Sequence, residues 1–326
     1  MSFTKNKDVS GNIVEAQELT KMFGKEVAVD SLTMYVPRGA IFGFIGPSGC
    51  GKTTTVRMLT GIHKPTSGSV SVLDKDPVKF LKSDREKIGY LIQNFVLYPE
   101  LTVWENLNFA ASFYGVSLFR GRHLNKLLDF VELKEDRNKL AGTLSGGMKR
   151  RLSLAATLVH NPELLFLDEP TAGIDPILRR KFWDYFKELQ SEGRTLFVTT
   201  QYVGEAAYCD FVGVMYAGRL LMVETPENLR KKAFGGELVH IKTTDWINHD
   251  SRKNLERLPF VQGEIKVIND REMEVIVDEA SEAMSPLVDA CRGEGITIET
   301  IEEILPPFDD VFVRLIEKES ANGPVL

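Results

Sequence analysis

Short apolar runs alternate with segments of helical spacing over the first two thirds of the chain. Residues 40–45, 164–167 and 195–199 are strand-length and almost entirely apolar, which indicates buried strands of a parallel sheet. Between them, apolar residues recur every three or four positions, as in amphipathic helices. This alternation favours an α/β domain. The other elements expected in this core are helices at 52–59, 178–190 and 203–208 and strands at 88–92, 211–215 and 219–224.

Two additions to this core are predicted from the same pattern. Residues 104–114, 123–131 and 149–159 have helical apolar spacing, so we expect an inserted helical subdomain at about 95–160. The runs nearer the N-terminus are expected to form an antiparallel β subdomain flanking the core. These runs cover residues 13–19, 27–36 and 68–73.

The pattern changes at Gly235-Gly236. Beyond this break the order of expected elements is βαββαβ followed by a last helix, which is compatible with a ferredoxin-like module. We therefore expect a first domain at 12–235 and a smaller α+β domain at 236–326. Its expected elements are strands at 238–242, 260–268, 272–277 and 296–304 and helices at 246–258, 281–292 and 309–318.

Composition excludes several classes of protein. The chain has 326 residues, of which 43% are apolar and 26% are charged, which suits two globular domains. No apolar run approaches the roughly 18 residues that a membrane helix needs. Residues 1–11 contain no apolar stretch that could serve as a secretory signal, and three cysteines do not make a disulfide framework. An integral membrane protein, a secreted mini-protein and a disordered chain are therefore excluded.

Charge is unevenly distributed along the chain. Residues 236–326 hold 9 Lys and Arg against 20 Asp and Glu, whereas residues 1–235 hold 31 against 26. The slightly basic first part suits polyanionic ligands or an anionic membrane surface, although an ordinary solvated surface would have the same charge. The acidic second part is poorly suited to nucleic acid, and we expect no nucleic-acid partner.

The strongest chemical signal is a phosphate-binding loop. It matches the pattern G-x-x-x-x-G-K-[ST] and lies between a predicted strand and a predicted helix, as the mechanism requires. Its backbone N–H groups and the N-terminus of the following helix can surround a phosphate. Lys52 can reach the β- and γ-phosphates, and the Thr53 hydroxyl can ligate Mg²⁺. The loop consists of Gly46, Pro47, Ser48, Gly49, Cys50, Gly51, Lys52, Thr53 and Thr54.

Two carboxylates follow a second buried strand. Asp168 and Glu169 come directly after residues 164–167. Because ligands of parallel sheets bind beyond the carboxyl ends of the strands, these carboxylates and the phosphate loop can share one site. Asp168 suits coordination of Mg²⁺ through water, and Glu169 can polarise an attacking water.

A second anion-binding element is predicted at residues 144–148 (Leu-Ser-Gly-Gly-Met). Ser145 is a suitable helix N-cap, and Gly146 and Gly147 expose amides at the start of the following helix. One nucleotide needs only one phosphate loop, so this second element requires another explanation.

In their order and spacing, these three motifs resemble the nucleotide-binding domain of ATP-binding-cassette (ABC) transporters over about residues 12–235. The resemblance implies a P-loop NTPase core, ATP with Mg²⁺, and a head-to-tail dimer. In that dimer Ser145 and Gly147 of one copy close over the γ-phosphate held by Lys52 of the other. It also implies that Phe23 stacks on adenine, that Gln93 senses Mg²⁺ and the γ-phosphate, and that residues 172–175 communicate across the dimer.

Two departures from the family pattern are informative. Met148 stands where many members have Gln, and Gln201 stands where the family usually has a switch histidine. An amide cannot become a cation, but it can hydrogen-bond a phosphate or orient a water. Three features together resemble the drug-resistance (daunorubicin-type) exporter subgroup. They are the string Thr199-Thr200-Gln201-Tyr202, the Met148 that ends the motif at 144–148, and residues 306–312. The resemblance implies a separate transmembrane permease subunit and a peripheral position at the cytoplasmic face of the cell membrane.

Other functions share some of these motifs. Importer ATPases contain all the nucleotide-binding motifs. The prediction of export therefore depends on the string that contains Gln201 and on the C-terminal extension, whose closing segment residues 306–312 resemble. DNA-maintenance ATPases separate the motifs by a long coiled coil, and ribosome-associated ABC proteins contain two cassettes. The single cassette without sustained heptads disfavours both. Cys50 could be a reactive thiol at a helix N-terminus, but a small residue filling a tight turn is the preferred interpretation.

Overall fold

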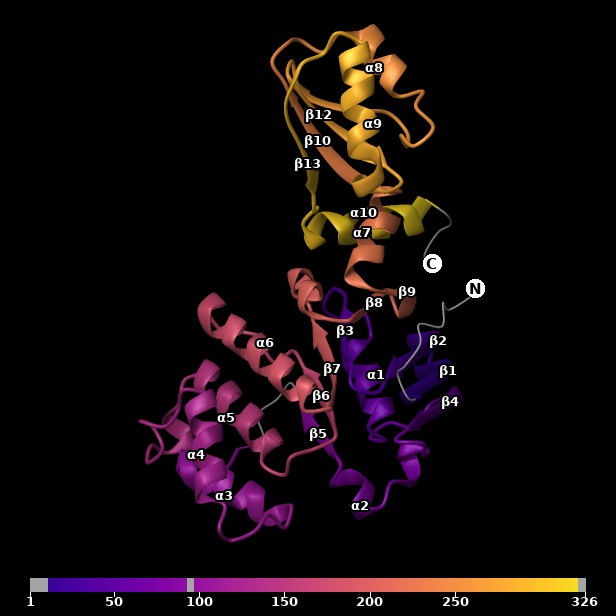
Figure 1. Cartoon of the computed structure of the whole chain (residues 1–326). Coiled ribbons are helices and arrows are strands. Elements are labelled where there is room, and N and C mark those ends of the chain that lie inside the picture. Colours follow the sequence, from indigo (N-terminus) through magenta and orange to yellow (C-terminus); the bar gives the residue numbers. More distant parts are fainter. Residues whose placement is uncertain (1–10, 93–96, 322–326) are drawn as a thin grey trace. The chain divides into compact units, whose positions relative to one another are not determined.

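The computed structural model describes residues 11–92 and 97–321 (Figure 1). These residues form two compact units, the first ending at Val223 and the second beginning at Glu224. No helix among the described residues has both the length and the apolar character required to cross a bilayer.

A six-stranded sheet forms the centre of the first unit. Its strand order is β5-β6-β7-β3-β8-β9, and β3 pairs in parallel with both β7 and β8. Strands β3, β6 and β7 have no exposed residue, which explains why the sequence reads there as continuous apolar runs. The strands are β3 (Ile41–Ile45), β5 (Ile88–Leu91), β6 (Leu164–Asp168), β7 (Thr195–Thr200), β8 (Phe211–Tyr216) and β9 (Arg219–Glu224).

An aromatic cluster fixes the two central strands side by side. The rings of Phe42 on β3 and Phe197 on β7 stack at 5.2 Å between centroids, and Phe44 lies 5.4 Å from Phe197. All three side chains are fully buried. Aromatic pairs of this kind contribute about 0.5–1.5 kcal/mol beyond their buried area. The cluster therefore supports the strands whose carboxyl ends hold the site.

The helices of the core are close to those predicted. Helix α1 (Lys52–Leu59) follows β3 directly, and α6 (Pro176–Ser191) starts at Asp175, whose side chain accepts hydrogen bonds from the amides of Ile177 and Leu178. The helix expected at 203–208 is a 3-10 helix, η3 (Val203–Tyr208). The remaining short elements of this unit are η1 (Pro77–Lys79), α2 (Lys82–Arg85) and η2 (Ala141–Thr143).

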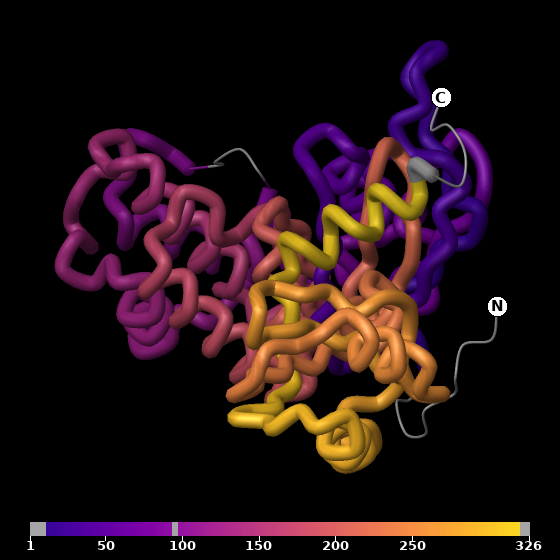
Figure 2. The backbone as a smooth tube through the Cα atoms, turned by 90° about the horizontal axis from the view of Figure 1, so that it is seen from above, coloured from indigo at the N-terminus to yellow at the C-terminus, as the bar shows by residue number. Residues whose placement is uncertain are grey.

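The two predicted additions to the core are present at opposite sides of the sheet in both views (Figures 1 and 2). Helices α3 (Val103–Phe113), α4 (Gly121–Phe130) and α5 (Gly146–Leu158) group together, drawn in magenta and pink. The indigo strands form an antiparallel sheet of order β2-β1-β4. These strands are β1 (Asn12–Phe23), β2 (Glu26–Pro37) and β4 (Ser67–Val72).

The second unit has the strand order of a ferredoxin-like module. Its sheet runs β11-β12-β10-β13, and the pairings of β10 with β12 and β13 and of β11 with β12 are antiparallel. The βαββαβ order predicted for this part is therefore observed. The elements are α7 (Pro226–Phe234), β10 (Glu237–Thr243), α8 (His249–Leu255), β11 (Lys266–Asn269), β12 (Glu272–Val277), α9 (Ala280–Gly293), β13 (Ile298–Ile304) and α10 (Phe308–Ala321).

Two predicted elements of this unit are shorter than expected by more than two residues. The helix expected at 246–258 begins only at His249, because the Asn248 side chain caps it by accepting the Ser251 amide at 2.7 Å. The strand expected at 260–268 forms only from Lys266 onward. Gly263 turns with φ +70° in the left-handed region, which interrupts an extended backbone.

Candidate nucleotide-binding site

The phosphate loop, residues 46–54, joins β3 to α1 and requires glycine at two positions. A Cβ on Gly46 would lie 2.2 Å from the Met215 carbonyl oxygen, so no larger residue fits without moving β8. Gly51 precedes the first residue of α1 with φ +109°, a conformation that L side chains rarely adopt. The loop backbone is therefore held close to β8 with the N-terminus of α1 pointing into it.

Lys52 places its charge inside the loop. Its side chain is buried, and Nζ donates hydrogen bonds to the carbonyl oxygens of Gly46 at 2.7 Å and Pro47 at 3.0 Å. A buried ammonium is stable only where such acceptors surround it. The cation and the amides at the start of α1 therefore face the same volume, in which an anion would be stabilised.

Thr53 and Asp168 meet although 115 residues separate them in the sequence. The Thr53 hydroxyl donates to Asp168 Oδ2 at 2.9 Å, and the Thr199 hydroxyl donates to Oδ1 at 2.5 Å. Asp168 is fully buried. A carboxylate beside a hydroxyl is a set of hard oxygen donors that suits Mg²⁺. These residues fit the metal proposed for them from the sequence.

Glu169 has an unusual backbone conformation. Its φ is +52°, in the left-handed region, which costs on the order of 1–3 kcal/mol for a residue other than glycine. The Glu169 amide donates to both the carbonyl oxygen and the hydroxyl of Thr199, at 3.0 and 3.1 Å. The side chain is partly exposed beyond the end of β6. Strain held in place by tertiary contacts is typical of functional sites.

Gln201 contacts the phosphate loop. The Ser48 hydroxyl donates to its Oε1 at 3.0 Å, across 153 residues of sequence. Gln201 follows β7, whose carboxyl end lies between those of β3 and β6. The structure thus brings Lys52, Thr53, Asp168, Glu169 and Gln201 to one edge of the sheet, as their sequence positions predicted.

Phe23 ends β1 with its ring 46% exposed. His63 packs edge-on against the ring with 5.6 Å between centroids, and Lys21 Nζ lies 5.1 Å from the ring centre. Much of the ring surface is therefore available for stacking.

Ser145, Gly146 and Gly147 begin helix α5. The Ser145 hydroxyl accepts the Met148 amide at 3.3 Å, which is the N-cap expected from the sequence. In the described part of the chain, no hydrogen bond joins these three residues to the phosphate loop. Gln93 lies outside the described residues.

The Cys50 thiol is buried within the loop. Burial raises its pKa above the ordinary value, and the Lys52 charge opposes this effect without overcoming it. The thiol is therefore protonated at neutral pH, which argues against the reactive thiolate considered from the sequence.

From the sequence, Thr199 is named only within the exporter-like string and is given no role in the site, although it holds both Asp168 and the Glu169 amide. The sequence signal for this role is a hydroxyl at the carboxyl end of a strand whose middle residues are apolar.

This arrangement defines a phosphate-loop nucleotide-binding protein. A family model described as "ABC transporter" matches residues 29–172. The daunorubicin resistance ATP-binding protein DrrA3 of Streptomyces coeruleorubidus is 35% identical over 298 residues, covering 90% of this chain and 93% of that protein. The Nod factor export ATP-binding protein I of Burkholderia pseudomallei (strain 1710b) is 36% identical over 234 residues, covering 71% and 77%. The chain therefore belongs to the ABC transporter family.

A longer relative matches only in part. The probable multidrug ABC transporter ATP-binding protein YbhF of Escherichia coli (strain K12) is 42% identical over 229 residues, which cover 69% of this chain. The match spans 39% of the length of that protein.

Solved structures share the fold of the first unit. An ATP-binding subunit of an ABC transporter superposes with a TM-score of 0.63 at 27% identity, over 68% of this chain and 93% of that chain. A dimeric ATP-binding cassette in a post-hydrolysis state with ADP and Pi gives a TM-score of 0.60 at 27% identity, over 65% and 98%.

Proposed function

We propose that this chain is the ATP-binding and ATP-hydrolysing subunit of an ABC exporter, acting with a separate transmembrane permease. The main support for the proposal is that Lys52, the Thr53–Asp168 pair and Glu169 lie together at one edge of the sheet. Export is supported by the names of the relatives, which refer to multidrug transport, drug resistance and Nod factor export.

In the proposed mechanism the loop residues 46–54 bind the phosphates and Phe23 stacks on adenine. Lys52 turns from the loop carbonyls to the β- and γ-phosphates, and Gln201 hydrogen-bonds the γ-phosphate or the attacking water. Glu169 accepts the proton of that water as general base. Bound Mg²⁺, held by Thr53 and Asp168 and by Gln93, would neutralise phosphate charge in the transition state.

Two copies are proposed to pair head to tail. The first amides of α5 in one copy, at Ser145–Gly147, would then close over the γ-phosphate bound by Lys52 of the other. The proposal is supported by the position of these residues at a helix N-terminus, where free amides and the helix dipole favour an anion. It also accounts for two anion-binding elements in a chain with one phosphate loop.

Phosphate release by the purified chain tests the proposed activity. We expect MgATP to be hydrolysed and EDTA to reduce the rate to background, because charge on the γ-phosphate is then left without a metal. Thr53→Ala should require a higher Mg²⁺ concentration for half-maximal rate, since one of the proposed oxygen ligands is removed. Phosphate release that is indifferent to EDTA would contradict the assignment of Thr53 and Asp168.

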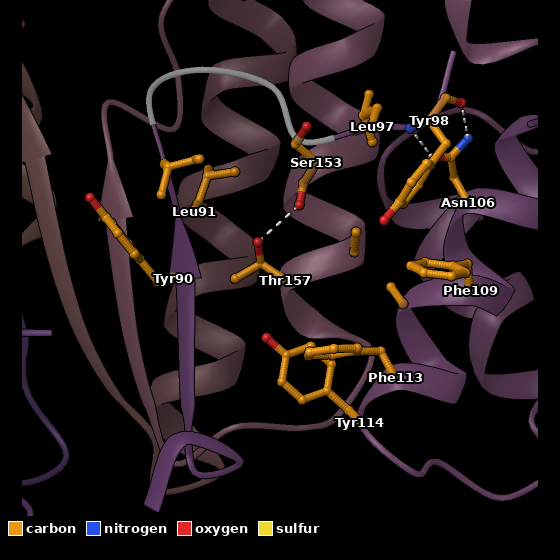
Figure 3. A pocket seen from close by; sticks show the side chains of 13 residues that line it. Tyr90, Leu91, Leu97, Tyr98, Asn106, Phe109, Phe113, Tyr114, Ser153 and Thr157 are labelled. Carbon is orange, nitrogen blue, oxygen red and sulfur yellow. Dashed lines mark hydrogen bonds between the residues drawn. The ribbon is translucent and has the colours of Figure 1, made fainter. Parts of the chain in front are cut away.

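The permease is proposed to dock in a groove beside α3. The groove has a volume of about 330 Å³ and an aromatic wall made by Tyr98, Phe109, Phe113 and Tyr114 (Figure 3). Ile92 and Leu97, which flank residues 93–96, also line it. Phe113 is 70% exposed, which suits an apolar partner helix. With this partner, the chain is proposed to lie peripherally at the cytoplasmic face of the cell membrane.

A charge in this groove should release the chain from its partner. We expect Phe113→Asp to lower the membrane-bound fraction in the native cell at least tenfold, because burying a carboxylate costs several kcal/mol. ATP hydrolysis by the isolated chain should be unchanged. Phe119→Asp is the matched control, since Phe119 is 98% exposed and lies outside the groove lining. Equal losses in both variants would argue against this docking site.

An importer subunit is the alternative, because importer ATPases use the same nucleotide chemistry. The relatives' names favour export. Transport of a labelled substrate in inverted vesicles containing the permease would distinguish the two directions.

A further inference from the structure

We propose that Arg150 is a positioning residue for Glu169: its guanidinium holds the peptide of the general base in its left-handed conformation and ties that peptide to helix α5. This inference depends on the proposed role of Glu169 in ATP hydrolysis.

Among the described residues, the buried cation of Arg150 reaches three separate backbone carbonyls. Only 4% of the residue is exposed. Nη1 donates to the Ile92 oxygen at 2.8 Å, and Nη2 donates to the Glu169 oxygen at 2.6 Å and to the Asp168 oxygen. A planar guanidinium with donors in a fixed fork can bind several acceptors at once, which a lysine ammonium cannot reproduce in the same geometry.

These contacts complete the restraint on the Glu169 backbone. Thr199 holds the amide of Glu169 from β7, and Arg150 holds the carbonyls on both sides of that residue from α5. With φ at +52°, the backbone would relax toward an ordinary conformation if these contacts were removed. Because the direction of the side chain follows from the backbone, the Glu169 carboxylate would then lose its alignment with the water that it activates.

The position of Arg150 gives the restraint a further consequence. Arg150 lies on α5, the helix that begins with Ser145–Gly147, and its third acceptor, Ile92, lines the groove proposed for the permease. A shift of α5 or of the groove wall therefore changes the hydrogen bonds that align Glu169. Neither element needs to contact the nucleotide of the same copy for this to happen.

The test compares Arg150→Lys in two backgrounds. In the otherwise unchanged chain, we expect the maximal rate of ATP hydrolysis to fall about 10- to 100-fold, the range for lost hydrogen bonds to a charged group. The affinity for a fluorescent ATP analogue should stay within about twofold. In a Glu169→Gln background the same substitution should change the residual rate by no more than about twofold, because residues that act through one group are non-additive.

Arg151 provides the matched control on the same helix. Its Nη1 donates to the carbonyl oxygens of Val131 and Glu132, away from the sheet edge, so Arg151→Lys should leave the hydrolysis rate within about twofold of the unchanged chain. Arg150→Met, with folding checked by circular dichroism, removes the charge as well and should lower the rate at least as far as Arg150→Lys.

Three results would overturn the proposal. These are an unchanged rate in Arg150→Lys, an equal loss in the Glu169→Gln background, and a loss of nucleotide affinity that matches the loss of rate. An unchanged chain that releases no phosphate from MgATP would instead overturn the proposed function itself.

Discussion

Glu169→Gln is expected to lower the rate of ATP hydrolysis by about 10²- to 10⁴-fold, the usual contribution of a general base. Glutamine keeps the size of the side chain and leaves the backbone contacts with Thr199 and Arg150 intact. ATP affinity should therefore be retained. With two copies paired as proposed, an ATP-bound dimer should accumulate because the nucleotide is no longer hydrolysed. Size-exclusion chromatography with MgATP measures the dimer, and phosphate release measures the rate.

Glu163→Gln is the control for this substitution. Glu163 precedes the same strand, β6, and pairs with Arg38 on the surface at the opposite end from Glu169. The rate of ATP hydrolysis by the Glu163→Gln variant should stay within about twofold of the rate of the unchanged chain. An unchanged rate in Glu169→Gln would remove Glu169 from the mechanism and leave the general base unassigned.

Lys52→Ala is expected to weaken ATP binding by about 10- to 100-fold and to reduce hydrolysis to background, because a charge-assisted contact with the phosphates is lost. The expected loss exceeds that of a surface lysine since Lys52 is buried inside the loop. Titration with a fluorescent ATP analogue measures the affinity, and thermal unfolding shows whether the loop still folds.

Lys79→Ala is the matched control, because Lys79 is an exposed lysine paired only weakly with Asp76. It should bind nucleotide as the unchanged chain does. Full ATP affinity in a folded Lys52→Ala protein would refute the phosphate-loop assignment.

The core and the main site could be predicted because their signals are local. Strands β3, β6 and β7 are buried on both faces and read as apolar runs, and glycines at the loop are required by the backbone itself. Ligands of parallel sheets bind beyond the carboxyl ends of the strands. This rule alone predicts that Lys52 and Asp168 lie at the same edge of the sheet.

Other features depend on contacts that no local pattern contains. A charged residue such as Arg150 within a helix normally reads as part of a solvated face, yet its acceptors lie 58, 18 and 19 residues away. The prediction of a strand at 260–268 was wrong before Lys266, because Gly263 turns the backbone. Apolar residues alone cannot distinguish an extended loop from a paired strand.

The sheet order has a consequence for how the protein is made. Among the described strands, β3, which ends at residue 45, pairs with β7 and β8, and these begin at residues 195 and 211. At about 5–20 residues per second, a ribosome needs on the order of 10–30 seconds to synthesise the intervening segment. During that time the nascent apolar strand lacks both of these partners, so the nucleotide site can assemble only after most of the first unit has been synthesised.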